Sequence, residues 1–231
     1  MMHEPIRLLI TAGPTHEPID AVRFLGNRSS GRVGASLADA AADRGWDVRM
    51  LMGPTPTRPR SDRVEIIPFR STADLGALLD EHLGWCDMLI MAAAVSDYTP
   101  DLDPDTRTGK WRRGKGPVTL RLIPTPDLLA RCAGRRREGQ ILVGFALEPR
   151  TRLTDAARAK LERKDIDYIV ANPLETMDAD TIAATLFRRG GEAVSSTDGE
   201  VGKAEFAAWL LDVLEPVAAD NRRSHADRPQ R

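Results

Sequence analysis

Short apolar runs alternate with stretches of helical periodicity through the first two thirds of the chain. Strands are predicted where a brief apolar run stands between turn-forming residues, and helices where apolar positions recur every three or four residues. The predicted strands are Ile6–Thr11, Asp47–Met52, Val64–Phe69, Met88–Val95, Val118–Leu122, Ile141–Ala146 and Tyr168–Ala171, followed by a hairpin of Ala184–Phe187 and Glu192–Ser195. The predicted helices are Ser30–Arg44, Thr72–Leu83, Pro126–Gly134, Thr151–Arg163 and Lys203–Val217.

This alternation predicts an α/β protein with a Rossmann-like, doubly wound and mainly parallel sheet, extended late in the chain by the hairpin. Met88–Val95 is almost continuously apolar, which is typical of a strand buried on both faces of a parallel sheet. Ligands of such folds bind beyond the carboxyl ends of the strands. We therefore expect functional residues in four places: Thr11–Pro14, Ala93–Asp97, Gly144–Glu148 and Ala171–Pro173.

Residues 97 to 117 interrupt the pattern. They lack apolar periodicity and contain three prolines, three glycines and charges of both signs. A loop of this length inside a compact domain is usually functional or disordered, so we predict a mobile lid at about 98–117. The chain is otherwise predicted to form one domain over residues 1–219, and the polar, basic residues 220–231 are predicted to be a disordered tail.

The composition narrows the class of protein. Of the 231 residues, 42% are hydrophobic and 29% are charged, and the net charge is −1, so no basic excess favours nucleic acid or an anionic membrane as a partner. The start of the chain lacks the pattern of a signal peptide, and the longest apolar run is too short to cross a bilayer. These features predict a cytoplasmic protein, in which Cys86 and Cys132 are ordinary thiols.

The segment Gly26-Asn27-Arg28-Ser29-Ser30-Gly31-Arg32-Val33-Gly34 leads into the first predicted helix. Its hydroxyls and free N–H groups, together with the helix dipole, favour an anion site at Ser29, Ser30 and Gly31. The alternative is that Ser29 or Ser30 only caps the helix. The Gly-x-Gly-x-x-Gly spacing of dinucleotide-binding proteins is absent, which argues against a nicotinamide oxidoreductase.

Three further segments hold candidate chemistry. Small residues before Asp97 allow a flat ligand close to the backbone, although Asp97 could equally cap a turn. Cations of the predicted lid could close over phosphates, although a solvated basic loop is the simpler interpretation. Phe145 could stack on a base or belong to the core. Lys160 and Lys164 share one helix face, where such pairs are often only solvated.

Several of these motifs together resemble those of the phosphopantothenate–cysteine ligases. The opening resemblance lies in Thr11-Ala12-Gly13-Pro14-Thr15, Glu17-Pro18-Ile19-Asp20, Val22-Arg23-Phe24 and Asn27-Arg28-Ser29-Ser30-Gly31. It continues in the same order through Ala92-Ala93-Ala94-Val95-Ser96-Asp97-Tyr98, Thr125-Pro126-Asp127, Gly144-Phe145-Ala146 and Ile169-Val170-Ala171-Asn172. The similarity runs from about Arg7 to Val217. In many bacteria this domain follows a flavin-dependent decarboxylase domain, so the chain resembles a stand-alone ligase or an excised domain, and neither flavin nor decarboxylation is expected of it.

The resemblance implies a ligase that joins 4′-phosphopantothenate to L-cysteine in coenzyme A biosynthesis. The carboxylate would attack the α-phosphate of CTP, release pyrophosphate and form an acyl-cytidylate, from which the amine of cysteine would displace CMP. Mg²⁺ is expected with the nucleotide, held mainly by the triphosphate and not by protein ligands. The resemblance further implies a homodimer and a possible separate decarboxylase partner. The alternatives are the same reaction with ATP, and a nucleotide-binding module that has lost catalysis.

The resemblance also assigns roles to residues. Asn27 matches the asparagine that holds the acyl-nucleotide, and Lys110 matches the lid lysine that meets the triphosphate; both are the expected catalytic residues. The remaining expected nucleotide contacts are Ala93, Asp97, Phe145, Lys160 and Lys164, and the expected phosphate or substrate contacts are Gly13, Ser29, Ser30 and Gly31.

The chain departs from the family pattern in two places. After Lys110 the family usually has an aliphatic residue and further lysines, where this chain has Trp111-Arg112-Arg113, and arginine binds phosphate through a planar fork. After Phe145 the common Ala-Ala-Glu-Thr becomes Ala146-Leu147-Glu148-Pro149, and one extra residue separates Phe145 from Lys160. These differences bear on the lysine assignments and on the choice of nucleotide.

Overall fold

A computed structural model describes residues 4–112, 114, 116–177 and 179–226. Its centre is an eight-stranded sheet in the order β13-β12-β10-β9-β6-β1-β4-β5. The strands are β1 (Arg7–Ala12), β4 (Asp47–Met52), β5 (Val64–Pro68), β6 (Met88–Met91), β9 (Ile141–Glu148), β10 (Tyr168–Pro173), β12 (Thr185–Arg188) and β13 (Ala193–Ser196). The strands from β10 to β5 are parallel, and the hairpin β12–β13 adds antiparallel strands. The predicted fold class is confirmed.

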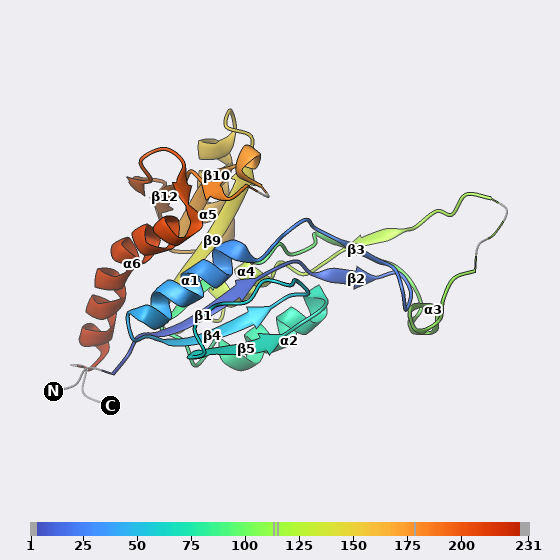
Figure 1. Cartoon of the computed structure of the whole chain (residues 1–231), viewed down its shortest axis with the longest axis horizontal. Helices are drawn as coiled ribbons and strands as arrows, with labels where there is room; N and C mark the ends of the chain where they lie inside the picture. The colour runs from blue at the N-terminus through green and yellow to red at the C-terminus, as the bar shows by residue number, and fades with distance from the viewer. Residues whose placement is uncertain (1–3, 113, 115, 178, 227–231) are drawn as a thin grey trace.

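Helices cover both faces of this sheet (Figure 1). One face carries α1 (Arg32–Asp43) and α6 (Lys203–Ala226), and the other carries α2 (Thr72–His82), α4 (Leu128–Ala133) and α5 (Leu153–Lys164). Successive residues of β1 alternate between the layers, because Leu8 and Ile10 belong to the first core and Leu9 to the second. All three side chains are fully buried, which explains the continuous apolar runs of the central strands.

The approach of α1 to the sheet depends on Gly34. A Cβ at this position would lie 2.4 Å from the Cβ of Ala12, at the carboxyl end of β1. Only a glycine therefore lets the helix cross β1 at this distance, and the crossing sets the start of α1 directly above the sheet edge. The site described below lies at this edge.

A long arm leaves the carboxyl edge of the sheet (Figure 1). We define the arm as the described residues of 16–26 and 98–124. It contains two antiparallel strand pairs, β2 (His16–Pro18) with β3 (Phe24–Gly26) and β7 (Tyr98–Pro100) with β8 (Leu122–Pro124), and the short helix α3 (Pro104–Thr108). The predicted strand Val118–Leu122 was therefore wrong: pairing with β7 places the strand at Leu122–Pro124, outside the main sheet.

Asp20 joins the two halves of the arm. Its carboxylate accepts hydrogen bonds from the backbone N–H groups of Val22, Arg23 and Trp111, at 2.9, 2.7 and 3.1 Å, and from the guanidinium of Arg23. These hydrogen bonds, that with the Arg23 side chain above all, hold the pKa of Asp20 well below its usual range. The guanidinium also donates to the carbonyl of Trp111 at 2.9 Å. The predicted lid is therefore ordered around Trp111, and is neither free of structure nor simply solvated there.

The end of α6 corrects a second prediction. The helix continues to Ala226, so the expected disordered tail is helical over residues 220–226, while 227–231 lie outside the described residues. Asn221 donates to the carbonyl of Gly139 at 3.0 Å, and Arg222 donates to the carbonyl of Pro5 at 2.5 Å. These tertiary bonds hold a polar segment that the sequence pattern alone predicts to be loose. No helix within the described ranges is long and apolar enough to cross a membrane.

Candidate functional site

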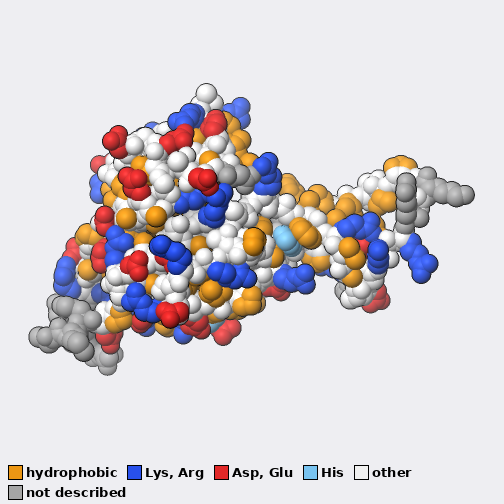
Figure 2. Space-filling view, viewed as in Figure 1, with side chains coloured by type: hydrophobic (Ala, Val, Ile, Leu, Met, Phe, Trp, Pro, Cys, Tyr) orange, Lys and Arg blue, Asp and Glu red, His pale blue; other side chains and the backbone are white. Residues whose placement is uncertain are grey.

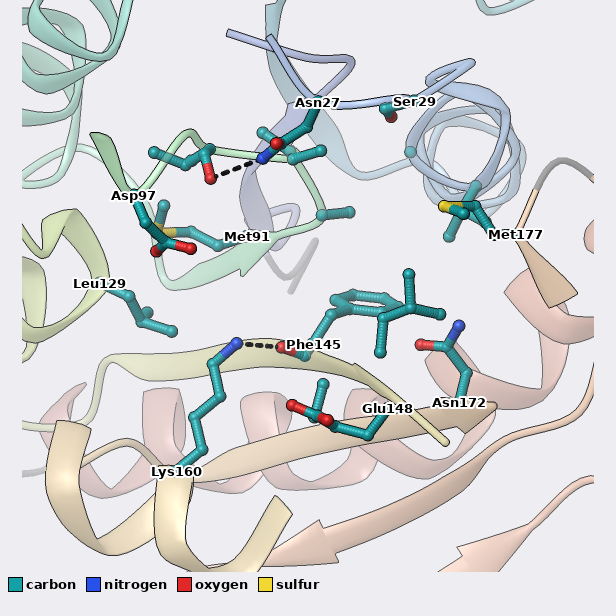
Figure 3. Close-up of a pocket in the computed structure, with 18 of the residues that line it drawn as sticks. Asn27, Ser29, Met91, Asp97, Leu129, Phe145, Glu148, Lys160, Asn172 and Met177 are labelled. Carbon is teal, nitrogen blue, oxygen red and sulfur yellow. Dashed lines mark hydrogen bonds between the residues drawn. The ribbon is translucent and has the colours of Figure 1, made fainter. Parts of the chain in front are cut away.

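A cavity of about 700 Å³ opens at the carboxyl edge of the sheet, between the start of α1, the segment after β6 and the ends of β9 and β10 (Figure 3). It lies where ligands of doubly wound folds bind. The structure brings nine of the eleven predicted site residues to this cavity: Asn27, Ser29, Ser30, Gly31, Ala93, Asp97, Phe145, Lys160 and Lys164. Their chemical roles stay predictions, but their convergence from distant parts of the sequence does not depend on those roles.

Asn27 enters the cavity directly from the arm, one residue after β3. Its amide nitrogen donates to the carbonyl of Val95 at 2.9 Å, which fixes the side chain across two segments of the cavity wall. An amide nitrogen carries two hydrogens, so one N–H remains for a ligand. Asn27 can therefore donate a hydrogen bond to an oxygen that gains negative charge.

The start of α1 is capped by Gly31, in the left-handed conformation at φ 72°, without a side-chain capping bond. The alternative that Ser29 or Ser30 caps the helix is therefore wrong. The hydroxyl of Ser29 accepts a long bond from the N–H of Gly31 at 3.4 Å, and that of Ser30 accepts from the N–H and the guanidinium of Arg32 at 3.5 and 3.3 Å. A helix start of this kind, with its positive dipole end at the cavity, is suited to an anion.

Gly13, by contrast, does not line the cavity. It has φ 80°, and a Cβ there would lie 3.2 Å from the Cα of Gly53. A Cβ built on Gly31 would lie 3.4 Å from the backbone nitrogen of Gly13, so Gly13 lies close behind the start of α1. The prediction that Gly13 contacts substrate is not supported by this placement, and its close packing accounts for the glycine.

Hydroxyl groups hold the segment after β6 in place. The N–H of Ala93 donates to Thr11 at 3.1 Å and that of Ser96 to Thr15 at 2.9 Å, while Thr125 donates to the carbonyl of Ser96 at 2.6 Å. The segment therefore presents its backbone to the cavity at Ala93. The carboxylate of Asp97 makes no hydrogen bond within the described part of the chain, so the alternative of a turn cap is wrong. Asp97 extends toward the cavity (Figure 3).

Two lysines of α5 form a cationic wall with Asp127. Lys164 donates to the Asp127 carboxylate at 2.9 Å, and Lys160 donates to the carbonyl of Phe145. Burial, reinforced by the neighbouring charge of Lys164, lowers the pKa of Lys160 to about 8. Burial alone would raise the pKa of Asp127, but hydrogen bonds from Lys164 and from the N–H of Ala130 outweigh it and lower this pKa. The lysines are thus partly buried groups with defined partners, not a solvated pair.

Phe145 packs against the core and also lines the cavity, while its stacking on a base stays a prediction. It packs against the core that α1 and α6 cover, with its ring centroid 6.3 Å from that of Phe206. The same side chain lines the cavity between Lys160 and Asn172 (Figure 3). A ring supported from behind in this way offers a fixed face to a planar ligand.

Lys110 is the other predicted site residue that does not reach the cavity. It is exposed on the arm, where Gly109 accepts a hydrogen bond from Ala21 at 3.0 Å and Trp111 is bound by Asp20. Arg112 is exposed on the same stretch, and Arg113 and Lys115 lie outside the described residues. Both neighbours of Lys110 are therefore attached to the loop between β2 and β3.

The cavity also contains polar residues to which sequence reasoning gave no role. Asn172 and Glu148 lie at the ends of neighbouring strands, and the expectation of functional residues at Gly144–Glu148 and Ala171–Pro173 covered their positions only. Lys203 and Thr176 come from the last third of the chain. No local motif marks Lys203, because only the packing of α6 beside α1 brings it to this edge.

Comparison with known proteins gives consistent relatives. A curated "Cysteine/Cysteine sulfinic acid decarboxylase" from an unknown prokaryotic organism is 45% identical over 169 residues, which cover 73% of this chain and 46% of that protein. The "Coenzyme A biosynthesis bifunctional protein CoaBC" of Mycobacterium tuberculosis (strain ATCC 25618 / H37Rv) is 41% identical over 175 residues, covering 72% of this chain and 41% of that protein. The chain thus spans about half the length of the curated relatives that it matches.

Solved structures agree with this relationship. The crystal structure of the C-terminal domain of CoaBC is 31% identical, with a TM-score of 0.77, and covers 94% of this chain and 100% of that one. A Cab2 mutant in complex with phosphopantothenate-cysteine shares the fold at 18% identity, with a TM-score of 0.74 and coverage of 96% and 89%. The family model for the DNA/pantothenate metabolism flavoprotein C-terminal domain matches residues 4–217. The chain therefore belongs to the family of DNA/pantothenate metabolism flavoprotein C-terminal domains.

Proposed function

We propose that this chain is a phosphopantothenate–cysteine ligase of coenzyme A biosynthesis. The observation that carries the proposal is the convergence of Asn27, Asp97, Phe145 and the α5 lysines on one cavity. A cavity of about 700 Å³ has room for a nucleotide and a second substrate. The motifs resemble those of the ligases, and the CoaBC relatives carry coenzyme A biosynthesis in their names.

The two walls of the cavity suit the two halves of such a reaction. Lys160 and Lys164 provide positive charge for the phosphates of a nucleotide, and Phe145 provides a planar face for its base. Asn27 lies on the opposite wall and can donate to the carbonyl oxygen of an activated acid. We propose CTP as the nucleotide on the strength of the resemblance, with ATP as the alternative.

Mg²⁺ would neutralise the triphosphate and assist the departure of pyrophosphate. Within the described residues, no group of three or more His, Cys, Asp and Glu side chains is arranged to hold a metal ion. Asp97 could contribute an oxygen ligand from the cavity wall. This donor fits a hard cation that keeps most of its contacts with phosphate oxygens.

We further propose that two copies pair through the arm. Val22, Phe24, Tyr98, Val118 and Leu122 are large apolar residues with more than two fifths of their surface exposed, and all belong to the arm. Figure 2 shows hydrophobic side chains along this projection, with cations toward its tip. An exposed apolar patch of this kind is typical of an interface. Phe24→Glu should convert a dimer to a monomer in light-scattering measurements, whereas a monomeric wild type would refute the pairing.

A decarboxylase encoded as a separate chain is a further proposed partner. The support is that the CoaBC relatives are named bifunctional. Co-purification of a flavoprotein with the chain from its own cells would test this. A cytoplasmic location stays a prediction.

The test of the function is pyrophosphate release by the purified protein with 4′-phosphopantothenate and Mg²⁺. CTP or ATP is supplied, with and without cysteine. Release that needs phosphopantothenate, together with amide formation that needs cysteine, is the expected result with CTP. A preference for ATP would keep the reaction and replace the nucleotide. No release with either nucleotide would favour the non-catalytic binding module.

A further inference from the structure

The cavity holds one carboxylate that the proposed reaction has not yet used. Its three described carboxylates are Asp97, Asp127 and Glu148. Asp127 is occupied by Lys164 and by the start of α4, and both Asp127 and Asp97 are among the charges that act most strongly on Lys160. Across the described chain, Glu148 has neither a hydrogen bond nor an ion pair through its carboxylate. It is therefore available to a ligand.

Its position is set by the sheet. Glu148 is the last residue of β9 and is paired with Pro173, the last residue of β10, so it stands where the sheet meets the cavity. The side chain is half-buried, and Figure 3 places it on the wall of Phe145, across the cavity from Asn27. A molecule lying between these walls can touch Asn27 on one side and Glu148 on the other.

Asn172 provides another acceptor at this edge of the sheet. Its amide nitrogen donates to the hydroxyl oxygen of Thr176 at 3.2 Å, and that hydroxyl donates its own hydrogen bond to the carbonyl of Pro173 at 2.7 Å. This chain of bonds fixes the orientation of the amide and leaves the oxygen of Asn172 as an acceptor. Asn172 pairs with Leu147 and Glu148 pairs with Pro173, so the two side chains leave opposite faces of the sheet at the cavity edge. The carboxylate of Glu148 therefore supplies the negative charge that suits an ammonium group with its three donors.

The proposed reaction needs such a group. The α-amino group of an amino acid has a pKa of about 8, so at neutral pH it is mostly an ammonium ion without the lone pair that attacks a carbonyl carbon. A nearby base must remove one proton before the new bond can form. Lys160 and Lys164 would bring like charge to the ammonium, so we expect it at the end of this wall that Glu148 forms and not beside the two lysines.

We propose that Glu148 binds the ammonium group of the incoming amino acid and takes its proton, a role that rests on the ligase reaction proposed above. One proton passes to the Glu148 carboxylate, and the freed lone pair forms the C–N bond. The C–O bond to the phosphate then breaks, and the nucleoside monophosphate leaves. The departing phosphate takes the second proton from nitrogen, and Glu148 returns its proton to water.

Activation of the acid and formation of the amide can be measured separately, and only amide formation should need Glu148. Without the amino acid, one round of pyrophosphate release reports only the activation of the acid. In Glu148→Gln this burst should equal that of the wild type, while turnover with cysteine should fall by roughly 100-fold or more, within the range of general acid–base catalysis. Hydroxylamine, which is unprotonated at neutral pH, needs no base and should form the hydroxamate at the wild-type rate.

Glu162→Gln is the matched control, since Glu162 is exposed on α5 and does not line the cavity. A fall in cysteine turnover of less than about tenfold in Glu148→Gln overturns the proposal, since that loss is below the range for a general base. An equal loss with hydroxylamine, or loss of the burst in this variant, also overturns it. The absence of a burst in the wild type would instead refute the ligase reaction on which the role depends.

Discussion

The arm and the body, which is the rest of the described chain, hold their functional groups by different means. In the body, Lys160 and Asn27 project from opposite walls of the cavity, and each has a hydrogen-bonding partner from another segment. In the arm, Lys110 is exposed, and its neighbours are held by the backbone N–H of Ala21, which donates to Gly109, and by the carboxylate of Asp20, which binds Trp111. The body is thus prepared for a ligand before one arrives. The arm carries a cation that is ordered but stands away from the cavity, so its use requires a movement or a second copy.

The strongest test of the prepared wall is Asn27→Ala. Loss of its N–H should lower amide formation by roughly 100- to 1000-fold, the usual effect of removing a donor from an oxyanion. Product formation, measured by the joining of labelled cysteine, checks this. Asn221→Ala, at the opposite end of the molecule, is the control. Wild-type turnover in Asn27→Ala would show that the wall binds ligand without taking part in catalysis.

The second test uses the pKa of Lys160, which is about 8 against an ordinary value of about 10.5. Its charge is present below pH 8, so nucleotide affinity in the free protein should fall as the pH rises through 8. Calorimetric titration of CTP across this range measures the fall. Lys160→Met should bind weakly and without this pH dependence. An unchanged pH dependence in that variant would assign the titration to another group.

The lowered pKa of Lys160 also affects folding stability, and here the charged form of the lysine is unfavourable. The folded state disfavours the charged lysine, so the penalty is fully present below pH 8 and disappears as the pH rises toward the unfolded value. At neutral pH the free energy of unfolding of Lys160→Met should therefore exceed that of the wild type by about 1–3 kcal/mol, after lost packing is allowed for. Urea denaturation measures the difference. A less stable variant would show that the bond to Phe145 outweighs the burial of charge.

The third test disturbs the close packing of α1 against β1. Gly34→Ala places a methyl group 2.4 Å from the Ala12 Cβ, where backbone atoms must shift. We expect a loss of about 1–3 kcal/mol of unfolding free energy, the usual cost of overpacking. Gly84→Ala is the matched control, because no atom lies within 4 Å of its added Cβ. Equal stability of the two variants would contradict the close crossing of α1 over β1.

The smallest global effect is expected from Asp20→Ala. The change removes the acceptor of Trp111 and Arg23, but it touches neither core, so the melting temperature should change much less than in Gly34→Ala. The arm itself should loosen, and trypsin should cleave faster after Lys110 and Arg112. Asp105→Ala, also exposed on the arm, serves as the control. Unchanged cleavage would show that the strand pairs alone hold the arm together.

The contrast also explains what the sequence could predict. Leu9 and Ile10 are both buried, on opposite faces of one strand, so both positions are apolar. The short apolar run that results was enough to predict this strand. The strands of the arm have three residues each and pair only with one another, so no periodicity marks them. The position of Lys110 depends on a hydrogen bond between Asp20 and Trp111, which are far apart in the sequence.

The site shows the same division. Asp97 follows the predicted strand Met88–Val95, and the rule that ligands bind beyond strand ends places it correctly. Asn27 was a candidate through its motif and the resemblance, because the pattern predicts no strand before it. Lys203 reaches the cavity only because α6 packs beside α1, which no local signal records. Residues 220–226 resemble a loose tail in composition, yet Asn221 and Arg222 bind the backbone of distant segments. Long-range contacts, and not local propensity, decide these cases.

The first described residues and the end of α6 lie together at the end of the molecule opposite to the arm, where Arg222 bonds to the carbonyls of Glu4 and Pro5 (Figure 1). An affinity tag, a fluorophore or a surface linker at either end would therefore stand far from both the cavity and the arm. Molecules immobilised in this way would all present the cavity edge to the solution. The protein is for that reason well suited to surface-based binding measurements and to fusion with a reporter.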